Sequence, residues 1–202
     1  MPNGSRILRR IANALEETIS DSLAEAWYAV FFVSLGFQVV VEPHGKAGPD
    51  FEITRNGHII IVEATRFRKV YDGPPEITLY NQFEITEYGD SARDIKKAYN
   101  KIVGKLNQIE DTEKTSILTI WNSDGDLEEI EMEAAIRHLR RDAGTKKILL
   151  PPNLAFIVFG PWDSHLTCYE IRSALSPYEE QLKHEIETMS IPSFMDYVLD
   201  TG

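Results

Sequence analysis

The chain has 202 residues, 43% of them apolar, which is enough to bury a core and fits one domain spanning residues 1–202 better than two. Its single cysteine, Cys168, excludes an internal disulfide, and no Cys/His spacing is typical of a zinc site. No stretch reaches the roughly 20 apolar residues of a membrane span. We therefore expect a cytoplasmic protein that makes no contact with membranes.

The net charge of −11 argues against a surface coated in basic residues for general DNA binding, because contacts with phosphate need Lys and Arg. The charge is unevenly spread along the chain. Residues 124–133 and 179–187 are acidic, whereas residues 66–69 and 93–105 are net basic. If nucleic acid binds, it should touch the two basic segments.

The first predicted element is a helix over Ser22–Leu35, where nearly every residue is apolar and Gly36 is suited to a left-handed stop. A β-branched strand is predicted next, over Phe37–Val41. Two further strands, Asp50–Thr54 and Ile59–Thr65, flank an Asn-Gly pair, the strongest short hairpin signal. The second of them opens on four apolar residues, so it should lie in the middle of a sheet.

The rest of the chain continues to alternate helices and strands. Residues 71–90, which hold two prolines, are predicted to be irregular. The later predictions are a helix over Ser91–Ile109, a strand over Ser116–Trp121, a helix over Leu127–Arg141, a strand over Leu154–Phe159 and a helix over Pro177–Met189. The pattern predicts an α/β fold with a mixed central sheet flanked by helices.

Asp50 and Glu63 are the candidate functional pair. Asp50 follows Pro49 at the start of one predicted strand, and Glu63 ends the apolar run of the next. A paired hairpin would deliver both carboxylates to one place, with Thr65 on the same face as Glu63 and Ala64 offering its backbone carbonyl. Such oxygen ligands suit Mg²⁺ (or Mn²⁺), which can activate water and stabilise charge during phosphodiester hydrolysis.

These residues and the element order resemble the PD-(D/E)XK nuclease superfamily, over roughly residues 22–121. The family has a helix carrying a glutamate, a three-stranded meander with a Pro-Asp and an acidic-x-lysine motif, then a helix and a strand. Glu25, Pro49-Asp50 and Glu63-Ala64-Thr65 occupy the corresponding positions. The resemblance implies a restriction endonuclease-like αβββαβ core with a C-terminal extension over residues 122–202, and it implies catalytic roles for Glu25, Asp50 and Glu63.

Thr65 departs from the family, which usually has lysine there. Some members move that lysine to a neighbouring element, so the candidates for a relocated cation are Arg66, Lys69, Lys101 and Lys105. Lys105 is favoured, because it shares one stripe of the predicted helix with Lys101 and Gln108, and such a stripe often faces the site in this family. The predicted contacts with the substrate are Arg66, Lys69, Lys101 and Gln108. Arg66 should point away from Thr65 if the strand is regular.

Each candidate also has an ordinary structural explanation. Asp50 could simply begin a strand and Glu63 end one. Glu25 could close a capping box with Ser22, and the lysines could form a solvated helix face. The first hypothesis is a Mg²⁺-dependent nuclease acting on DNA. The resemblance also implies a homodimer, because duplex cleavage by this fold usually needs two active sites. The rivals are a catalytically inactive domain of this fold with a binding or regulatory role, and an unrelated α/β domain.

Overall fold

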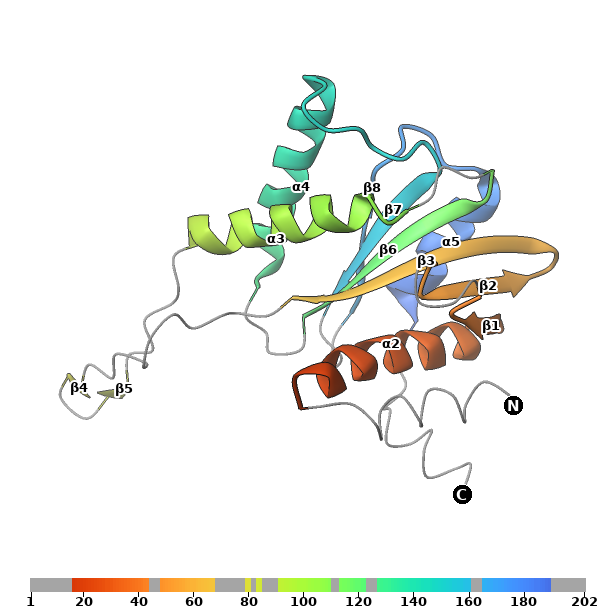
Figure 1. The fold of residues 1–202 in the computed structure, drawn as a ribbon, viewed down its shortest axis with the longest axis horizontal. Coiled ribbons are helices and arrows are strands. Elements are labelled where there is room, and N and C mark those ends of the chain that lie inside the picture. The colour runs from red at the N-terminus through yellow and green to blue at the C-terminus, as the bar shows by residue number, and fades with distance from the viewer. Residues whose placement is uncertain are drawn as a thin grey trace.

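A six-stranded mixed sheet runs through the centre of the protein (Figure 1). The computed structural model describes residues 16–43, 48–67, 79–80, 83–84, 91–109, 113–122, 127–160 and 165–189. The strands lie in the order β1-β2-β3-β6-β7-β8. Their bounds are β1 Gln38–Val41, β2 Phe51–Arg55, β3 His58–Phe67, β6 Thr115–Asn122, β7 Leu154–Gly160 and β8 Thr167–Glu170.

The directions of the strands show how the sheet is built. β1, β2 and β3 form an antiparallel meander, and β3, β6 and β7 are mutually parallel, with β8 antiparallel at the far edge. The turn between β2 and β3 has positive φ at both Asn56 (52°) and Gly57 (80°), as a two-residue hairpin of this twist requires. β3 lies inside the sheet, as its apolar sequence predicts.

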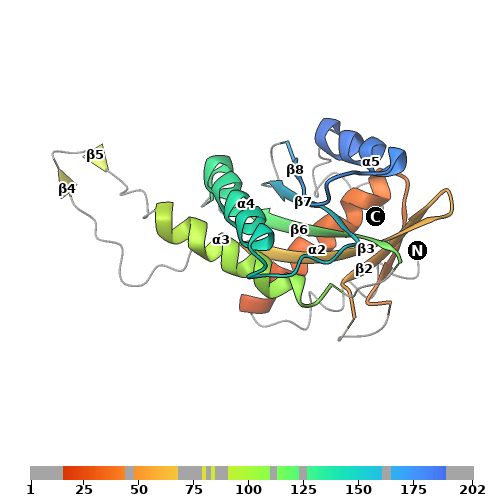
Figure 2. The same ribbon diagram turned by 90° about the horizontal axis from the view of Figure 1, so that it is seen from above.

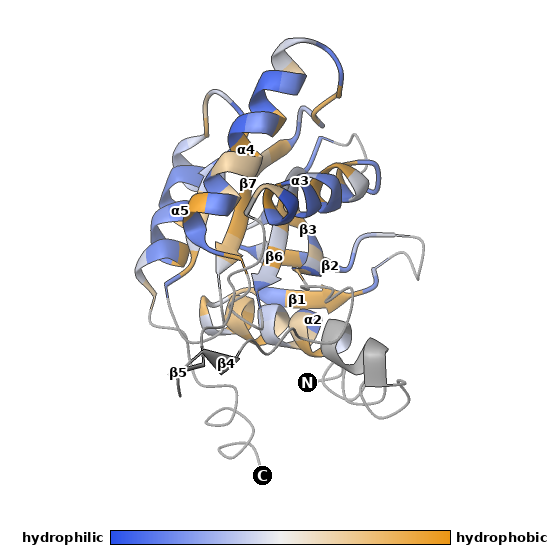
Figure 3. Ribbon diagram, turned by 90° about the vertical axis from the view of Figure 1, so that its left-hand side faces the viewer, coloured by the Kyte–Doolittle hydropathy of each residue, from blue (hydrophilic) through white to orange (hydrophobic). Residues whose placement is uncertain are grey.

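Helices cover both faces of the sheet, as Figures 1 and 2 show. α2 (Glu16–Ser34) and α5 (Pro177–Thr188) share one hydrophobic cluster with the sheet, and α3 (Ser91–Leu106) and α4 (Glu129–Gly144) share a second on the opposite face. Hydrophobic colour gathers on strands such as β7, whereas the helices carry hydrophilic stretches (Figure 3). Val62 and Ala64 face the α2 side, so Glu63 and Thr65 face the α3 side.

The predicted fold class is confirmed, and the order α2, β1, β2, β3, α3, β6 is that of an αβββαβ core. α2 ends as predicted, since Gly36 adopts a φ of 83° and Phe37 N–H donates to the carbonyl of Phe32. Two short strands, β4 (Leu79–Tyr80) and β5 (Phe83–Glu84), lie in the stretch predicted to be irregular. β8 was not predicted. Among the described helices, none combines the length and apolar character that crossing a membrane needs.

Two element boundaries correct the sequence predictions. α2 begins at Glu16, so Ser22 lies inside the helix instead of at its N-terminus. The capping box proposed for Ser22 and Glu25 is therefore wrong, because a capping residue must precede the first helical turn. α3 ends at Leu106, before Ile109, and the next residues form turns back onto the carbonyls of Lys105 and Leu106.

Candidate active site

Asp50 and Glu63 lie next to each other where the β2–β3 ladder ends. The last pair of that ladder joins Phe51 to Val62. Asp50, just before Phe51, and Glu63, just after Val62, are therefore the next residues beyond the end of the ladder. The Asp50 carbonyl accepts a hydrogen bond from the Glu42 N–H (2.9 Å), and its carboxylate Oδ2 accepts one from the Ala64 N–H (2.8 Å). The aspartate is therefore fixed through both its backbone and its side chain.

Lys105 supplies a cation to this pair from the last turn of α3. Its Nζ lies 3.0 Å from Glu63 Oε2 and 3.8 Å from Asp50 Oδ2. A cation is also favoured at the C-terminal end of a helix by the helix dipole. The structure thus brings Asp50, Glu63 and Lys105 together, as the sequence predicts, although their roles in catalysis and metal binding stay predictions.

The electrostatics of Glu63 are unusual for an ion-paired carboxylate. Its side chain is only 3% exposed, and burial, followed by the nearby Asp50 carboxylate, raises the pKa of Glu63 to about 7. Lys105 opposes this shift through its charge and its hydrogen bond, without cancelling it. One ammonium therefore compensates two neighbouring carboxylates only in part, and an added positive charge would be bound favourably here.

The donors at this point fit a hard divalent cation. A residue's N–H and C=O point to the same side of a strand, so the Ala64 carbonyl lies on the β2 side of β3, as its N–H does. Two carboxylates and one carbonyl suit Mg²⁺ or Mn²⁺, which bind through few protein oxygens and keep several waters. Among the residues that the structure describes, no three Asp, Glu, His or Cys side chains gather into a metal-binding group.

Among the described residues, Glu25 is not gathered with Asp50 and Glu63 into a group of three possible ligands. It lies half-buried on α2, the helix on the opposite face of the sheet from Lys105, and it has an interaction of its own. Its predicted catalytic role, exerted directly or through water, stays a prediction.

Thr65 and Arg66 occupy the faces that strand alternation assigns to them. β3 stays in register with β6 as far as Phe67, so Thr65 is buried on the same face as Glu63. Arg66 is half-buried, strand alternation places it on the α2 face, and it has an interaction partner. The structure thus separates Arg66 from the Lys105 side of the site, in agreement with the sequence argument.

The other predicted substrate contacts are less well supported by the fold. Lys101 is exposed one turn before Lys105 on α3. Gln108 lies beyond the end of α3, in a turn where its N–H donates to the Lys105 carbonyl, so the predicted single stripe of Lys101, Lys105 and Gln108 is wrong at its last member. Lys69 lies outside the described residues.

One residue near the site was missed by the sequence analysis. Thr119 on β6 is completely buried, and its Oγ1 donates a hydrogen bond to the Glu63 carbonyl (3.2 Å). A signal was available, because Thr119 is the single polar residue in the run Ile117–Trp121. A lone hydroxyl in a buried strand needs a partner, which makes such a residue worth tracing.

Comparisons with known proteins do not assign the chain to a family. No protein-family model matches the sequence, and no curated protein matches it significantly. A chain from the CdiA-CT/CdiI toxin and immunity complex of Burkholderia pseudomallei is similar in structure, with a TM-score of 0.45 and 16% sequence identity. That match covers 79% of this chain and 91% of the other.

Proposed function

We propose that the protein is a nuclease of the PD-(D/E)XK type that hydrolyses phosphodiester bonds in DNA with Mg²⁺ or Mn²⁺. The observation that carries the proposal is the position of Lys105, whose Nζ lies within 4 Å of both Asp50 and Glu63 carboxylates. This is the partner that a strand lysine would otherwise provide at Thr65. The αβββαβ order of the elements supports the same assignment.

The residues divide the work of hydrolysis. The carboxylates of Asp50 and Glu63, with the Ala64 carbonyl, would hold the divalent cation, which when bound activates water and offsets negative charge on the phosphate. The Lys105 ammonium stabilises the charge that develops on the phosphate oxygens and orients the attacking water. Lys101, exposed one turn away, contacts the DNA backbone, and Arg66 and Lys69 are further candidates for such contacts.

A second candidate function is favoured by the same ion pair. Because Lys105 already compensates part of the charge on Asp50 and Glu63, the cluster could be stable without any metal. The presence of Thr65 in place of the motif lysine also favours an inactive protein. The protein would then be an inactive nuclease-fold module with a binding or regulatory role.

A cleavage assay separates these two functions. The wild-type protein, with single-stranded, duplex and branched DNA, should cut at least one substrate with Mg²⁺ or Mn²⁺, and it should be inert in EDTA. Glu63→Gln should abolish cutting. Lys114→Ala is a matched control, since Lys114 also pairs with a strand glutamate, Glu52, at 2.8 Å, and it should cut normally. Absence of metal-dependent cutting by the wild type would contradict the nuclease proposal.

The expected homodimer is tested separately. If duplex DNA is the substrate, two copies would place one active site on each strand. Sedimentation of the protein with and without duplex DNA and Ca²⁺ should then show a species of twice the monomer mass. A monomer that cuts both strands at the same rate would rule out this part of the proposal.

A further inference from the structure

The peptide group that joins Glu63 to Ala64 is held on both sides by side chains. Its oxygen accepts a hydrogen bond from the Thr119 hydroxyl (3.2 Å), and its N–H donates to Asp50 Oδ2 (2.8 Å). On the β2 side the strand ladder has already ended at Val62, so the Asp50 carboxylate takes the place of a strand carbonyl. A single peptide plane thus connects a buried hydroxyl to the candidate metal-binding aspartate.

Hydrogen bonds in such a chain strengthen one another. A hydroxyl that donates to a peptide oxygen draws electron density toward that oxygen, which makes the N–H of the same peptide a better donor. The effect is largest where water is excluded, and Thr119 is 0% exposed while Glu63 is 3% exposed. The stronger Ala64 N–H bond in turn fixes the orientation of the Asp50 carboxylate and thereby the direction of its second oxygen.

We propose that Thr119 is a positioning residue for Asp50, acting through the Glu63–Ala64 peptide group. Its hydroxyl also keeps the Ala64 carbonyl in place, because that carbonyl belongs to the same short segment of β3. The proposal extends the nuclease function above and rests on it only for the effect on Mg²⁺ affinity. The hydrogen-bond relay itself is a property of the protein without metal or DNA.

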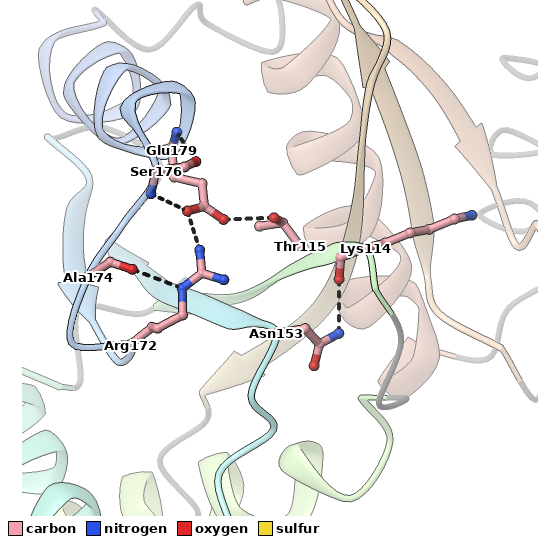
Figure 4. Close-up of polar contacts among 7 residues, drawn as sticks. All are labelled: Lys114, Thr115, Asn153, Arg172, Ala174, Ser176 and Glu179. Carbon is pink, nitrogen blue, oxygen red and sulfur yellow. Dashed lines mark hydrogen bonds and ion pairs between the residues drawn. The ribbon is translucent and has the colours of Figure 1, made fainter.

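The test uses three variants of β6 in the full-length chain. Thr119→Val removes the hydroxyl and keeps the shape of the side chain, and Thr119→Ser restores a hydroxyl. Thr115→Val is the matched control, because Thr115 lies on the same strand and donates a hydrogen bond to Glu179 at 2.7 Å, away from the site (Figure 4). It removes one threonine hydrogen bond from β6 without touching the Glu63–Ala64 peptide group.

The first readout is the Ala64 amide proton in the metal-free protein, measured by NMR. Thr119→Val should shift its resonance upfield and speed its exchange with solvent, relative to both wild type and Thr115→Val. The second readout is the affinity for Mg²⁺ by calorimetry, which should fall by about tenfold in Thr119→Val, as losses of supporting hydrogen bonds at metal sites typically do. Thr119→Ser should recover most of both effects.

An unchanged Ala64 resonance and unchanged Mg²⁺ affinity in Thr119→Val would overturn the proposal, as would equal effects from Thr115→Val. If Thr119→Val does not fold, Thr119→Ala and Thr119→Ser provide the same contrast between a lost and a kept hydroxyl. If Thr119→Val shows the Ala64 response but the wild type never cuts DNA, the nuclease function is contradicted and the positioning role of Thr119 stays in place.

Discussion

Two glutamates of this protein are almost equally buried, but their pKa values are shifted in opposite directions. Glu63 is 3% exposed and Glu179 is 2% exposed, and each pairs with one basic side chain. The Glu179 carboxylate accepts hydrogen bonds from the Thr115 hydroxyl, the Arg172 guanidinium and the Ser176 N–H (Figure 4). Glu63 pairs with Lys105, and the same ammonium lies near a second carboxylate, that of Asp50.

The pKa values follow from this difference in surroundings. Burial would raise the pKa of Glu179, but the hydrogen bonds from Ser176, Thr115 and Arg172 outweigh it and lower the pKa below its ordinary value. At Glu63, burial and Asp50 together raise the pKa to about 7. A buried carboxylate whose two oxygens both accept hydrogen bonds from the protein stabilises the fold. One that shares a single cation with a neighbour retains the capacity to bind something more.

The sharpest test of the contrast is the loss of function on removing a site carboxylate. Asp50→Ala or Glu63→Ala should lower metal-dependent cleavage by at least about 1,000-fold, because the divalent cation that would stabilise the reacting phosphate loses a ligand. The folded state should be kept or slightly stabilised, since two adjacent carboxylates repel each other. Initial rates of cleavage and thermal melting measure the two effects, and a variant that fails to fold would mark the residue as structural.

Glu179 should behave in the opposite way. Glu179→Ala leaves Arg172 without its carboxylate and breaks the cap of α5, so the free energy of unfolding should fall by about 3 kcal/mol. Urea titration at pH 7 measures this loss. Cleavage per folded molecule should stay within about twofold of wild type. A stable Glu179→Ala protein would show that the closed network contributes little.

Lys105 should matter more to rate than to stability. Lys105→Ala should lower turnover by about 100-fold, as the loss of one charge-stabilising group typically does. Lys114→Ala removes a comparable ion pair with Glu52 and should change turnover by less than about twofold. If activity survives the loss of both Lys101 and Lys105, the relocated lysine is ruled out and the metal alone must activate water.

The dependence of stability on pH should also distinguish the two glutamates. Between pH 4.5 and 7 the folded protein keeps a proton on Glu63 that the unfolded chain has lost, so this group's contribution to stability falls as pH rises. Relative to Glu63→Ala, wild type should lose about 1–3 kcal/mol across this window, the lower figure allowing for solvent screening. Glu179 acts oppositely, because its contribution is lost as the pH falls below its ordinary pKa. Urea midpoints at several pH values test both signs.

The smallest effect is expected at Thr65. Lys105 already supplies a cation beside Glu63, so Thr65→Lys should change turnover by less than about threefold or crowd the site. In a Lys105→Ala background the same substitution should recover part of the lost rate. If instead the wild type is inert and Thr65→Lys alone creates cleavage, the helix lysine does not replace the strand lysine.

The hairpin and its carboxylates were predictable because they depend on local rules. Asn56 and Gly57 set the turn, and the period of two along each strand then fixes which side chains meet. The prediction for Lys105 depended on the resemblance to the PD-(D/E)XK nucleases as well as on helix periodicity. Thr119 could not be assigned a role from sequence, because its partner, the Glu63 carbonyl, lies 56 residues away on a strand whose register with β6 is set by the whole sheet.

The two capping-box sequences show the limit of a local motif. Ser22-Leu23-Ala24-Glu25 and Ser176-Pro177-Tyr178-Glu179 have the same pattern, but only the second caps a helix. Proline favours the first turn of a helix, so α5 begins at Pro177. No proline comes directly after Ser22, and α2 extends on its N-terminal side to Glu16. The sequence analysis placed Glu179 only in an acidic segment. The Ser176-x-x-Glu179 motif could have identified it as a capping residue. β8 has four residues and no apolar run, so no pattern marked it.

Because the lysine is on α3, the two parts of the site can differ in their stability against local unfolding. Asp50 and Glu63 belong to the β2–β3 hairpin, whereas Lys105 depends on how α3 packs against the sheet and α4. A fluctuation that frees the last turn of α3 would remove the cation and leave the carboxylates assembled. The same opening would clear the space beside Glu63 for an incoming ion. Hydrogen exchange of the Lys105 amide, compared with that of Val62, would report how often the protein visits this state.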